Sequence, residues 1–401
     1  MQAAILRLLL AAATPVTRSE LGLRLGVGRN TVGLEVRRLL DAGILEAAGF
    51  TESHGGRRSL LVRVSPAAGY VGAVDLGATS IDVAITTLAS EVVAQAAEDV
   101  DVAIGPRAIL DKATTMLCEL LAGRGADLAD LRAVGIGVPG PVAQADGRVV
   151  APPLMPGWND FPVRDALAEL VACPVFVDND VNLMAIGEHA RGVARDVADF
   201  VFVKVGTGIG TGLFVNSALV RGADGCAGDL GHVCVEPAGP TCSCGNVGCL
   251  EAVAAGPAIA RAGEEAARAG RARLLAATLE RKGALDARDV GDAAGHGDLG
   301  ALTVVREAAG RIGAALATMV SLLNPSVIVI GGGVSRIGHV FLAEIRTAVY
   351  ARSLPLATRN LPIVPSALAA DAGVVGASVL ATGLLIDVAD VREERWVPIG
   401  R

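Results

Sequence analysis

The residues best suited to binding a metal ion lie close together in the second half of the chain. Cys242, Cys244 and Cys249 stand on a glycine-rich segment, and His232 precedes them, so that one imidazole and three thiols fall within 18 residues. A Cys₃His set fills the four positions of a tetrahedral zinc ion and leaves none open, which is typical of a structural site. Cys234 is close enough to be a rival ligand, and ordinary free cysteines are the alternative. The spacing predicts a structural zinc site in a reducing compartment.

Three glycine-rich turns follow strand-like segments and could bind phosphate through backbone N–H groups. Residues 75–80 lie between strands predicted at 70–76 and 81–87, residues 206–212 lie between strands at 200–205 and 213–215, and residues 331–333 follow a strand at 327–330. None of them has the spacing of a Rossmann dinucleotide site. The candidate nucleotide-binding residues are Asp75, Gly77, Thr79, Gly206, Thr207, Gly208, Gly210 and Gly332.

A polar cluster ends the buried strand that begins at Val175. In open α/β sheets ligands bind at the carboxyl ends of strands. Asp180 could accept a proton from a sugar hydroxyl during phosphoryl transfer, and Asn179 could hold the same sugar through its amide. The alternative is a helix N-cap, where Asp and Asn are favoured.

The first 68 residues differ in charge from the rest of the chain. They contain nine arginines and five acids, a net charge of +4, whereas the whole chain carries −7 and the remainder therefore −11. Helical periodicity, a Thr17-x-x-Glu20 capping box and a Gly26-Val27-Gly28 turn predict a helix-turn-helix, and a cationic glycine hairpin between two short strands predicts a wing. The candidate DNA-binding residues are Arg29, Asn30, Thr31, Arg37, Arg57 and Arg58. The alternative is a helical docking domain whose arginines are only solvated.

Length and composition predict two or three domains with cores of Ala, Val, Leu and Ile. The chain has 401 residues, of which 52% are hydrophobic and 3% aromatic, and this excludes a disordered protein. The apolar segment 5–13 lacks a preceding cationic region and is interrupted by Arg7, so it is predicted to be a helix of a cytoplasmic protein rather than a signal peptide. No membrane-spanning helix is expected, because the apolar run 320–334 is broken by Asn324, Pro325 and glycines.

Taken together, these motifs resemble the ROK family of sugar kinases and sugar-responsive repressors, and the head resembles its repressor branch. The most specific part is 205–251, where the second glycine turn, Gly228-Asp229-Leu230-Gly231-His232 and the Cys-x-Cys-Gly-x-x-Gly-Cys-x-Glu knuckle follow in family order. The resemblance implies an α/β fold class: a winged helix-turn-helix at 1–66, then a two-lobed actin-like ATPase fold of the sugar-kinase type. Its first lobe would span 70–187, closed by a C-terminal helix at about 372–390, and its second lobe, with the zinc knuckle, would span 188–371.

The same resemblance implies a sugar pocket and a set of partners. The pocket residues would be Gly137, Val138, Asn179, Asp180, Asp229, His232 and Glu251, and Asp180 would be the base of a kinase. The zinc ligands would be His232, Cys242, Cys244 and Cys249. The partners would be operator DNA, a sugar effector and further copies of the chain in a homodimer or homotetramer.

Three departures from the family pattern are visible. Ala78 and Ser80 stand where family kinases usually have glycine and lysine, which argues against binding of ATP and Mg²⁺. Asp229 replaces the usual glutamate, and Pro152-Pro153 replaces a common Pro-Asn. We therefore expect a sugar-responsive transcriptional regulator. An ATP-dependent sugar kinase with a DNA-binding head is the alternative, and a zinc hydrolase ranks third because the Cys₃His set has no open position.

Overall fold

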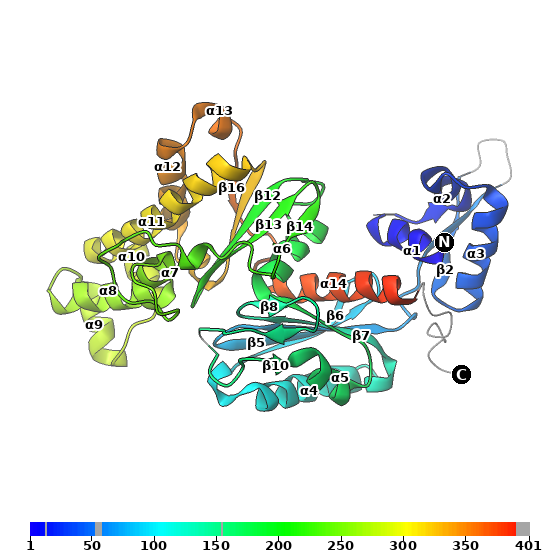
Figure 1. Cartoon of the computed structure of the whole chain (residues 1–401), viewed down its shortest axis with the longest axis horizontal. Helices are drawn as coiled ribbons and strands as arrows, with labels where there is room; N and C mark the ends of the chain where they lie inside the picture. Colours follow the sequence, from blue (N-terminus) through cyan, green and yellow to red (C-terminus); the bar gives the residue numbers. More distant parts are fainter. Residues whose placement is uncertain (13, 53–57, 154, 390–401) are drawn as a thin grey trace.

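A computed structural model of the chain describes residues 1–12, 14–52, 58–153 and 155–389. It consists of a small N-terminal head and a body of two lobes (Figure 1). Each lobe contains one five-stranded mixed sheet, with the strand orders β11-β7-β4-β5-β6 and β14-β13-β12-β15-β16. This architecture confirms the expected α/β fold class.

The head has three helices and a three-stranded sheet of order β1-β3-β2. The side chain of Thr17 accepts a hydrogen bond from the Glu20 N–H at the start of the second helix, and Gly43 has the positive φ expected just after the third. The elements are α1 (Gln2–Ala11), β1 (Val16–Thr17), α2 (Arg18–Leu25), α3 (Arg29–Asp41), β2 (Leu45–Phe50) and β3 (Leu60–Val64). Strand β1 was not expected. The predicted wing tip, including Arg57, lies outside the described residues.

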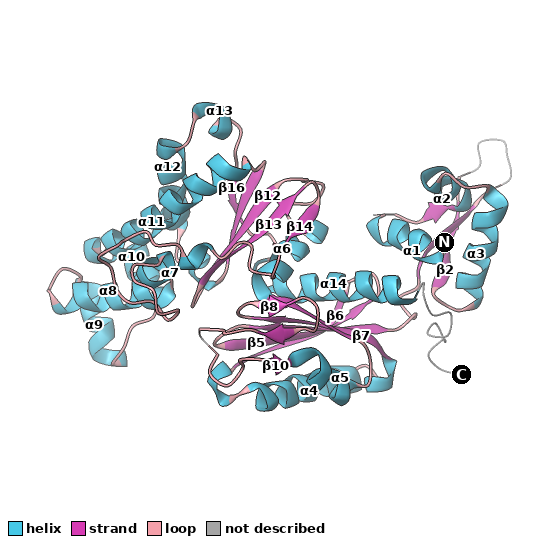
Figure 2. Cartoon of the chain, in the orientation of Figure 1, coloured by secondary structure: helices cyan, strands magenta, loops and turns pink. Residues whose placement is uncertain are grey.

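The first lobe places helices on both faces of its sheet (Figure 2). Apolar residues of α4 and α5 pack with Val74 and Ile136 on one face, whereas α6 and α14 pack against Ala73 and Ala84 on the other. The residues on this second face are small because α14 lies too close to the sheet for larger side chains. The elements are β4 (Tyr70–Leu76), β5 (Ser80–Thr87), β6 (Val92–Asp99), α4 (Pro106–Ala122), β7 (Leu131–Val138), α5 (Val163–Val171), β11 (Val175–Asn179) and α6 (Asp180–Arg191). A small sheet of β8 (Val142–Ala143), β9 (Arg148–Val149) and β10 (Phe161–Pro162) lies beside it.

The second lobe packs its sheet against a helical layer whose long member is α11. Its strands are β12 (Phe200–Val205), β13 (Ile209–Val215), β14 (Ala218–Val220), β15 (Val327–Gly331) and β16 (Ile363–Pro365). Its helices are α7 (Leu250–Ala254), α8 (Gly256–Arg268), α9 (Arg273–Lys282), α10 (Ala287–Gly295), α11 (Leu299–Leu323), α12 (His339–Arg352) and α13 (Pro355–Thr358). The second glycine turn is shorter than expected, because β13 already begins at Ile209.

Helix α14 (Ala372–Ala389) returns to the first lobe, where it lies along one face of the sheet and reaches the head with its C-terminal end (Figure 1). By length and composition the segment 369–387 could cross a membrane, a feature that the sequence analysis did not single out. In the structure it is a core helix, because Ala377 and Leu385 are buried against the sheet and the head. Helix α6 runs past residue 187, so the expected boundary between the lobes falls inside a helix.

Candidate functional site

A cavity of about 1280 Å³ lies between the two lobes. It brings together most of the residues that the sequence analysis singled out: Asp75, Gly77, Thr79, Asn179, Asp180, Gly206, Thr207, Gly208, Gly210, Asp229, His232, Glu251 and Gly332. Gly137 and Val138, which were also expected at the sugar pocket, do not line the cavity, because both are buried in β7. The next three residues, Pro139 to Pro141, line it instead. The three glycine turns thus meet the polar end of β11 at one cavity, as the argument from strand ends predicts.

Asn179 caps the N-terminus of α6. Its Oδ1 accepts hydrogen bonds from the N–H groups of Val181 (2.9 Å) and Asn182 (3.3 Å), and its Nδ2 donates to the Gly140 carbonyl (3.0 Å). The N-cap interpretation therefore holds for this residue. The cap also fixes the first turn of α6, which carries Asp180 into the cavity, and ties it to the loop after β7.

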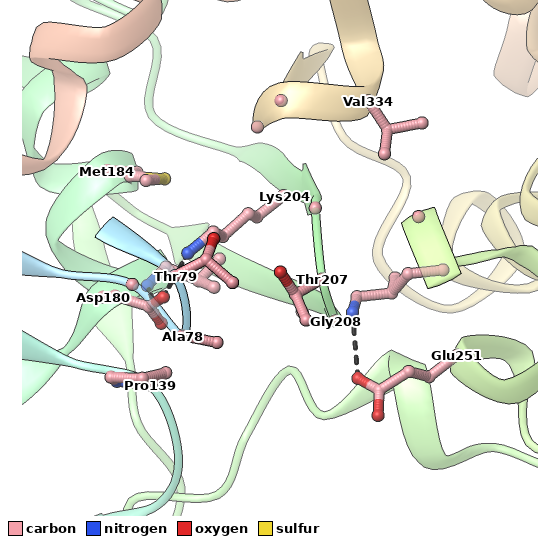
Figure 3. A pocket seen from close by; sticks show the side chains of 18 of the residues that line it. Ala78, Thr79, Pro139, Asp180, Met184, Lys204, Thr207, Gly208, Glu251 and Val334 are labelled. Carbon is pink, nitrogen blue, oxygen red and sulfur yellow. Dashed lines mark hydrogen bonds and ion pairs between the residues drawn. The ribbon is translucent and has the colours of Figure 1, made fainter. Parts of the chain in front are cut away.

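Asp180 forms an ion pair with Lys204, a residue that the sequence analysis did not consider (Figure 3). The Lys204 side chain is 18% exposed and that of Asp180 is 4% exposed, so the pair is largely shielded from water. Burial lowers the pKa of Lys204, but the carboxylates of Asp180 and Asp75 outweigh this and hold the pKa above its ordinary value. Burial raises the pKa of Asp75 to about 7, against the opposing effect of Lys204.

A second buried ion pair joins the two lobes behind the cavity. Asp178 on β11 is fully buried, and its Oδ2 accepts hydrogen bonds from Nε (2.9 Å) and Nη2 (2.7 Å) of Arg221, which follows β14. Its Oδ1 accepts from the Asn179 N–H (2.8 Å) and from Nδ2 of Asn182 (2.9 Å). This carboxylate therefore connects a strand of the first lobe, the start of α6 and the second lobe. The sequence showed Asp178 in the polar cluster but gave no sign of its partner.

The four predicted zinc ligands form one cluster. The ligand atoms of His232, Cys242, Cys244 and Cys249 all lie within 4.8 Å of one another. The Cys244 and Cys249 sulfurs are 3.7 Å apart and the Cys242 sulfur is 3.5 Å from Nδ1 of His232, close to the edges of a tetrahedron with zinc–ligand distances of about 2.0–2.3 Å. The donor set therefore fits a structural zinc ion. Cys234, the rival candidate, is exposed and lies outside this cluster.

The metal cluster and the cavity share residues. With Nδ1 of His232 facing the sulfurs, its Nε2 points toward Asp229, at 3.9 Å from Oδ1. Burial raises the pKa of Asp229, and the nearby imidazole opposes that shift. Glu251, two residues after Cys249, accepts a hydrogen bond from the Ile209 N–H (3.1 Å) at the end of the second glycine turn (Figure 3). The knuckle thus holds one edge of the cavity against β13.

The exposed face of the head carries the candidate DNA contacts. Arg29, Asn30, Thr31 and Arg37 are exposed on α3, and Arg58 is exposed beside the predicted wing tip. None of the described residues forms an ion pair with Arg29, Arg37 or Arg58. Val32, Val36 and Leu39 on the opposite face are buried in the head core. The helix therefore presents uncompensated cations on the side that a recognition helix turns to DNA.

The fold and the cavity define a class: a two-lobed, actin-like body of the sugar-kinase type that carries a winged helix-turn-helix. The comparisons agree with this. The ROK family model matches residues 71–383. A glucokinase of Halalkalibacterium halodurans is 37% identical over 77% of this chain and 93% of its own length.

Two further matches extend over the head as well as the body. The xylose repressor of Bacillus subtilis is 26% identical over 94% of this chain and 93% of its own. A crystal structure described as a ROK family transcriptional regulator, a homolog of the E. coli MLC protein, has a TM-score of 0.83 at 24% identity and covers 99% of this chain and 98% of its own. The chain therefore belongs to the ROK family, and its full-length matches place it with the transcriptional regulators, since the glucokinase aligns only to the body.

Proposed function

We propose that this regulator binds operator DNA through α3 and the wing, and that a sugar or sugar derivative in the cavity between the lobes changes this binding. The observation that carries the proposal is a continuous path of packed helices from the cavity to the head. Helix α6 starts at the cavity with Asn179 and Asp180, α14 packs along α6, and the head packs on the far end of α14.

Helices α6 and α14 approach so closely that no side chain fits between them at two glycines. A Cβ at Gly187 of α6 would lie 2.3 Å from the Ala372 carbonyl oxygen, and a Cβ at Gly376 of α14 would lie 1.8 Å from the Leu183 carbonyl oxygen. Helices in such contact transmit a displacement rather than absorbing it, because packed interiors resist compression. A change of lobe closure that moves α6 therefore also moves α14.

The other end of α14 belongs to the core of the head. Leu385 and Ile386 are buried with Ile5 and Leu9 of α1, and Asp387 forms an ion pair with Arg7. A displaced α14 thus reorients the head. In a homodimer or homotetramer this changes the distance between two recognition helices, which must match the spacing of the half-sites in an operator. Ligand binding shifts the population between fitting and non-fitting arrangements.

In this proposal the sugar contacts the polar residues that meet at the cavity. Asn179, Asp180 and Asp229 offer side-chain oxygens from the two lobes, and Glu251 and His232 border the same space on the zinc knuckle. Zinc, when bound, supplies a rigid tetrahedral cross-link and no open position for catalysis. The Cys₃His metal set and the DNA partner favour a cytoplasmic location.

The test is fluorescence anisotropy of a labelled DNA fragment from the protein's own promoter, at fixed moderate salt, with and without a panel of sugars and amino sugars. The proposal predicts DNA binding that one of these ligands changes. Absence of binding to any promoter fragment contradicts the regulator function, and a sugar that binds without altering DNA affinity contradicts the coupling through α14.

A sugar kinase remains the second candidate, because Asp180 and the glycine turns share one cavity. An ATP-dependent phosphorylation assay with Asp180→Asn as control separates the two, since only turnover that disappears in the variant supports catalysis. The ion pair between Asp180 and Lys204 argues against this candidate, because the ammonium occupies the carboxylate that would have to accept the proton of a sugar hydroxyl.

A further inference from the structure

Lys204 occupies the last inward position of an otherwise apolar strand face. Along β12, Phe200 and Phe202 pack with Val181 and Met184 of α6, and the period of two places Lys204 next on the same face. Its partners in the sheet are both glycines, Gly210 on β13 and Gly331 on β15, so no side chain projects from the cross-strand positions beside it. The strand therefore directs the lysine past the phenylalanines to the first turn of α6.

Three carboxylates act on this one ammonium group. Asp180 forms the ion pair. Asp75 and Asp82 stand opposite each other on β4 and β5, line the same cavity, and both raise the pKa of Lys204 through their charge. Asp75 and Asp180 flank one point, since a Cβ at Gly137 would lie 3.4 Å from Oδ1 of Asp75 and 3.2 Å from Cα of Asp180. Asp75 is 5% exposed, and its Oδ1 has no hydrogen-bond partner among the described residues.

Such a cluster of carboxylates at a phosphate-binding turn is where a kinase would hold Mg²⁺ and its nucleotide. Here the place is already taken by a positive charge that belongs to the chain. A divalent cation would have to approach Asp75 against the ammonium of Lys204, or to displace that ammonium from Asp180. The residues present therefore do not fit a Mg²⁺–nucleotide complex.

We propose that Lys204 is a built-in counter-ion of the cavity: its ammonium replaces a divalent cation among Asp75, Asp82 and Asp180, and its ion pair holds the Asp180 side chain in place as a hydrogen-bond acceptor for a ligand hydroxyl. The cavity then binds its ligand without Mg²⁺ or nucleotide. The role assigned to Asp180 rests on the proposed function, whereas the replacement of the cation does not.

The experiment measures cation binding by the full-length, zinc-loaded protein in the absence of sugar and DNA. Mg²⁺ and its paramagnetic substitute Mn²⁺ are the probes, with thermal unfolding and Mn²⁺ electron paramagnetic resonance as readouts. Lys204→Met removes the charge at similar length, and Lys204→Arg keeps it. Arg268→Met is the matched control, because it breaks the ion pair of Arg268 with Glu264, and neither residue lines the cavity.

We expect Lys204→Met to bind Mn²⁺ at least about tenfold more tightly than the wild type, since an uncompensated carboxylate cluster attracts a divalent cation. The wild type, Lys204→Arg and Arg268→Met should show no Mg²⁺-dependent change in melting temperature. Equal Mn²⁺ affinity in the wild type and in folded Lys204→Met overturns the proposal.

A second measurement uses the wild type alone and so does not depend on the folding of a variant. The chain has three lysines, Lys112, Lys204 and Lys282, so that ¹³C-lysine labelling gives a small set of NMR signals, which the variants assign. We expect the Lys204 signal to remain unbroadened by millimolar Mn²⁺ and to shift in Asp180→Asn. Selective broadening of this signal in the wild type would show a cation in the cluster and refute the replacement. Failure of every sugar to bind would instead contradict the proposed function and leave the cation results unchanged.

Discussion

Removal of the guanidinium of Arg221 should destabilise the protein far more than removal of a surface arginine. Arg221 donates two hydrogen bonds to Oδ2 of Asp178, which is fully buried, whereas Oδ1 keeps its bonds to Asn179 and Asn182. In Arg221→Met the carboxylate stays buried with Oδ2 unpaired. Breaking one partner of a buried ion pair costs about 3–5 kcal/mol.

Water reaches part of this site, because the Arg221 side chain is 29% exposed. Solvent screening reduces the cost, so we expect a loss of about 2–3 kcal/mol in the free energy of unfolding. For a lobe of this size that corresponds to a fall of about 4–12 °C in melting temperature. The same pair links the two walls of the cavity, and the dissociation constant of the sugar should therefore rise as well.

The assay is thermal unfolding of the wild type and of three variants. Arg148→Met is the matched control, because Arg148 pairs with Asp146 and Asp160 at the surface, where such pairs contribute less than about 1 kcal/mol. Arg221→Met combined with Asp178→Asn should recover part of the loss, because no charge is then left buried. Equal melting temperatures for Arg221→Met and Arg148→Met would refute this account of how the lobes are joined.

Three further predictions concern pH, zinc and DNA. Burial raises the folded-state pKa of Asp75 from 3.8 to about 7, so the stability that its protonated form contributes is complete below about pH 4 and is lost as the pH rises through 7. Asp75→Asn should therefore flatten the fall in melting temperature between about pH 5 and pH 8. An unchanged pH profile in this variant would show that Asp75 does not have the raised pKa. Cys244→Ser should lower the zinc content and weaken sugar binding about 10- to 100-fold, at a pH where circular dichroism shows that the protein is still folded. Unaltered sugar affinity in zinc-free protein would show that the zinc cluster does not position Glu251 for sugar binding. Arg37→Ala should reduce the slope of log affinity for DNA against log salt by about 1. Arg268 lies in the body and pairs with Glu264, so Arg268→Ala should leave this slope unchanged. The same slope in both variants would show that Arg37 does not contact DNA.

The sequence by itself determined the features that depend on neighbours along the chain. The capping residue Thr17 and the spacing of Val32 and Val36 predicted the helices of the head, and strand β4 was expected with the bounds that the structure gives it. The zinc cluster was equally accessible, because its ligands fall within one short segment and their chemistry is specific. Such signals are local. The two-lobed fold was predicted from the resemblance to the family, which the motif between residues 205 and 251 carries.

The tertiary structure alone decided which charges meet. Lys204 and Asp180 are 24 residues apart, and Asp178 and Arg221 are 43 apart; each pair forms only because two sheets and α6 end at the same cavity. The only feature of the sequence that pointed to Lys204 was its position as a lysine in an otherwise apolar strand, and this feature does not predict which carboxylate it pairs with. The resemblance implied that a C-terminal helix closes the first lobe, but only the structure showed that α14 packs on α6 and on the head, since an apolar helix looks the same in sequence whether it packs in a core or spans a membrane. Long-range pairing depends on the assembled geometry, and periodicity and spacing do not encode it.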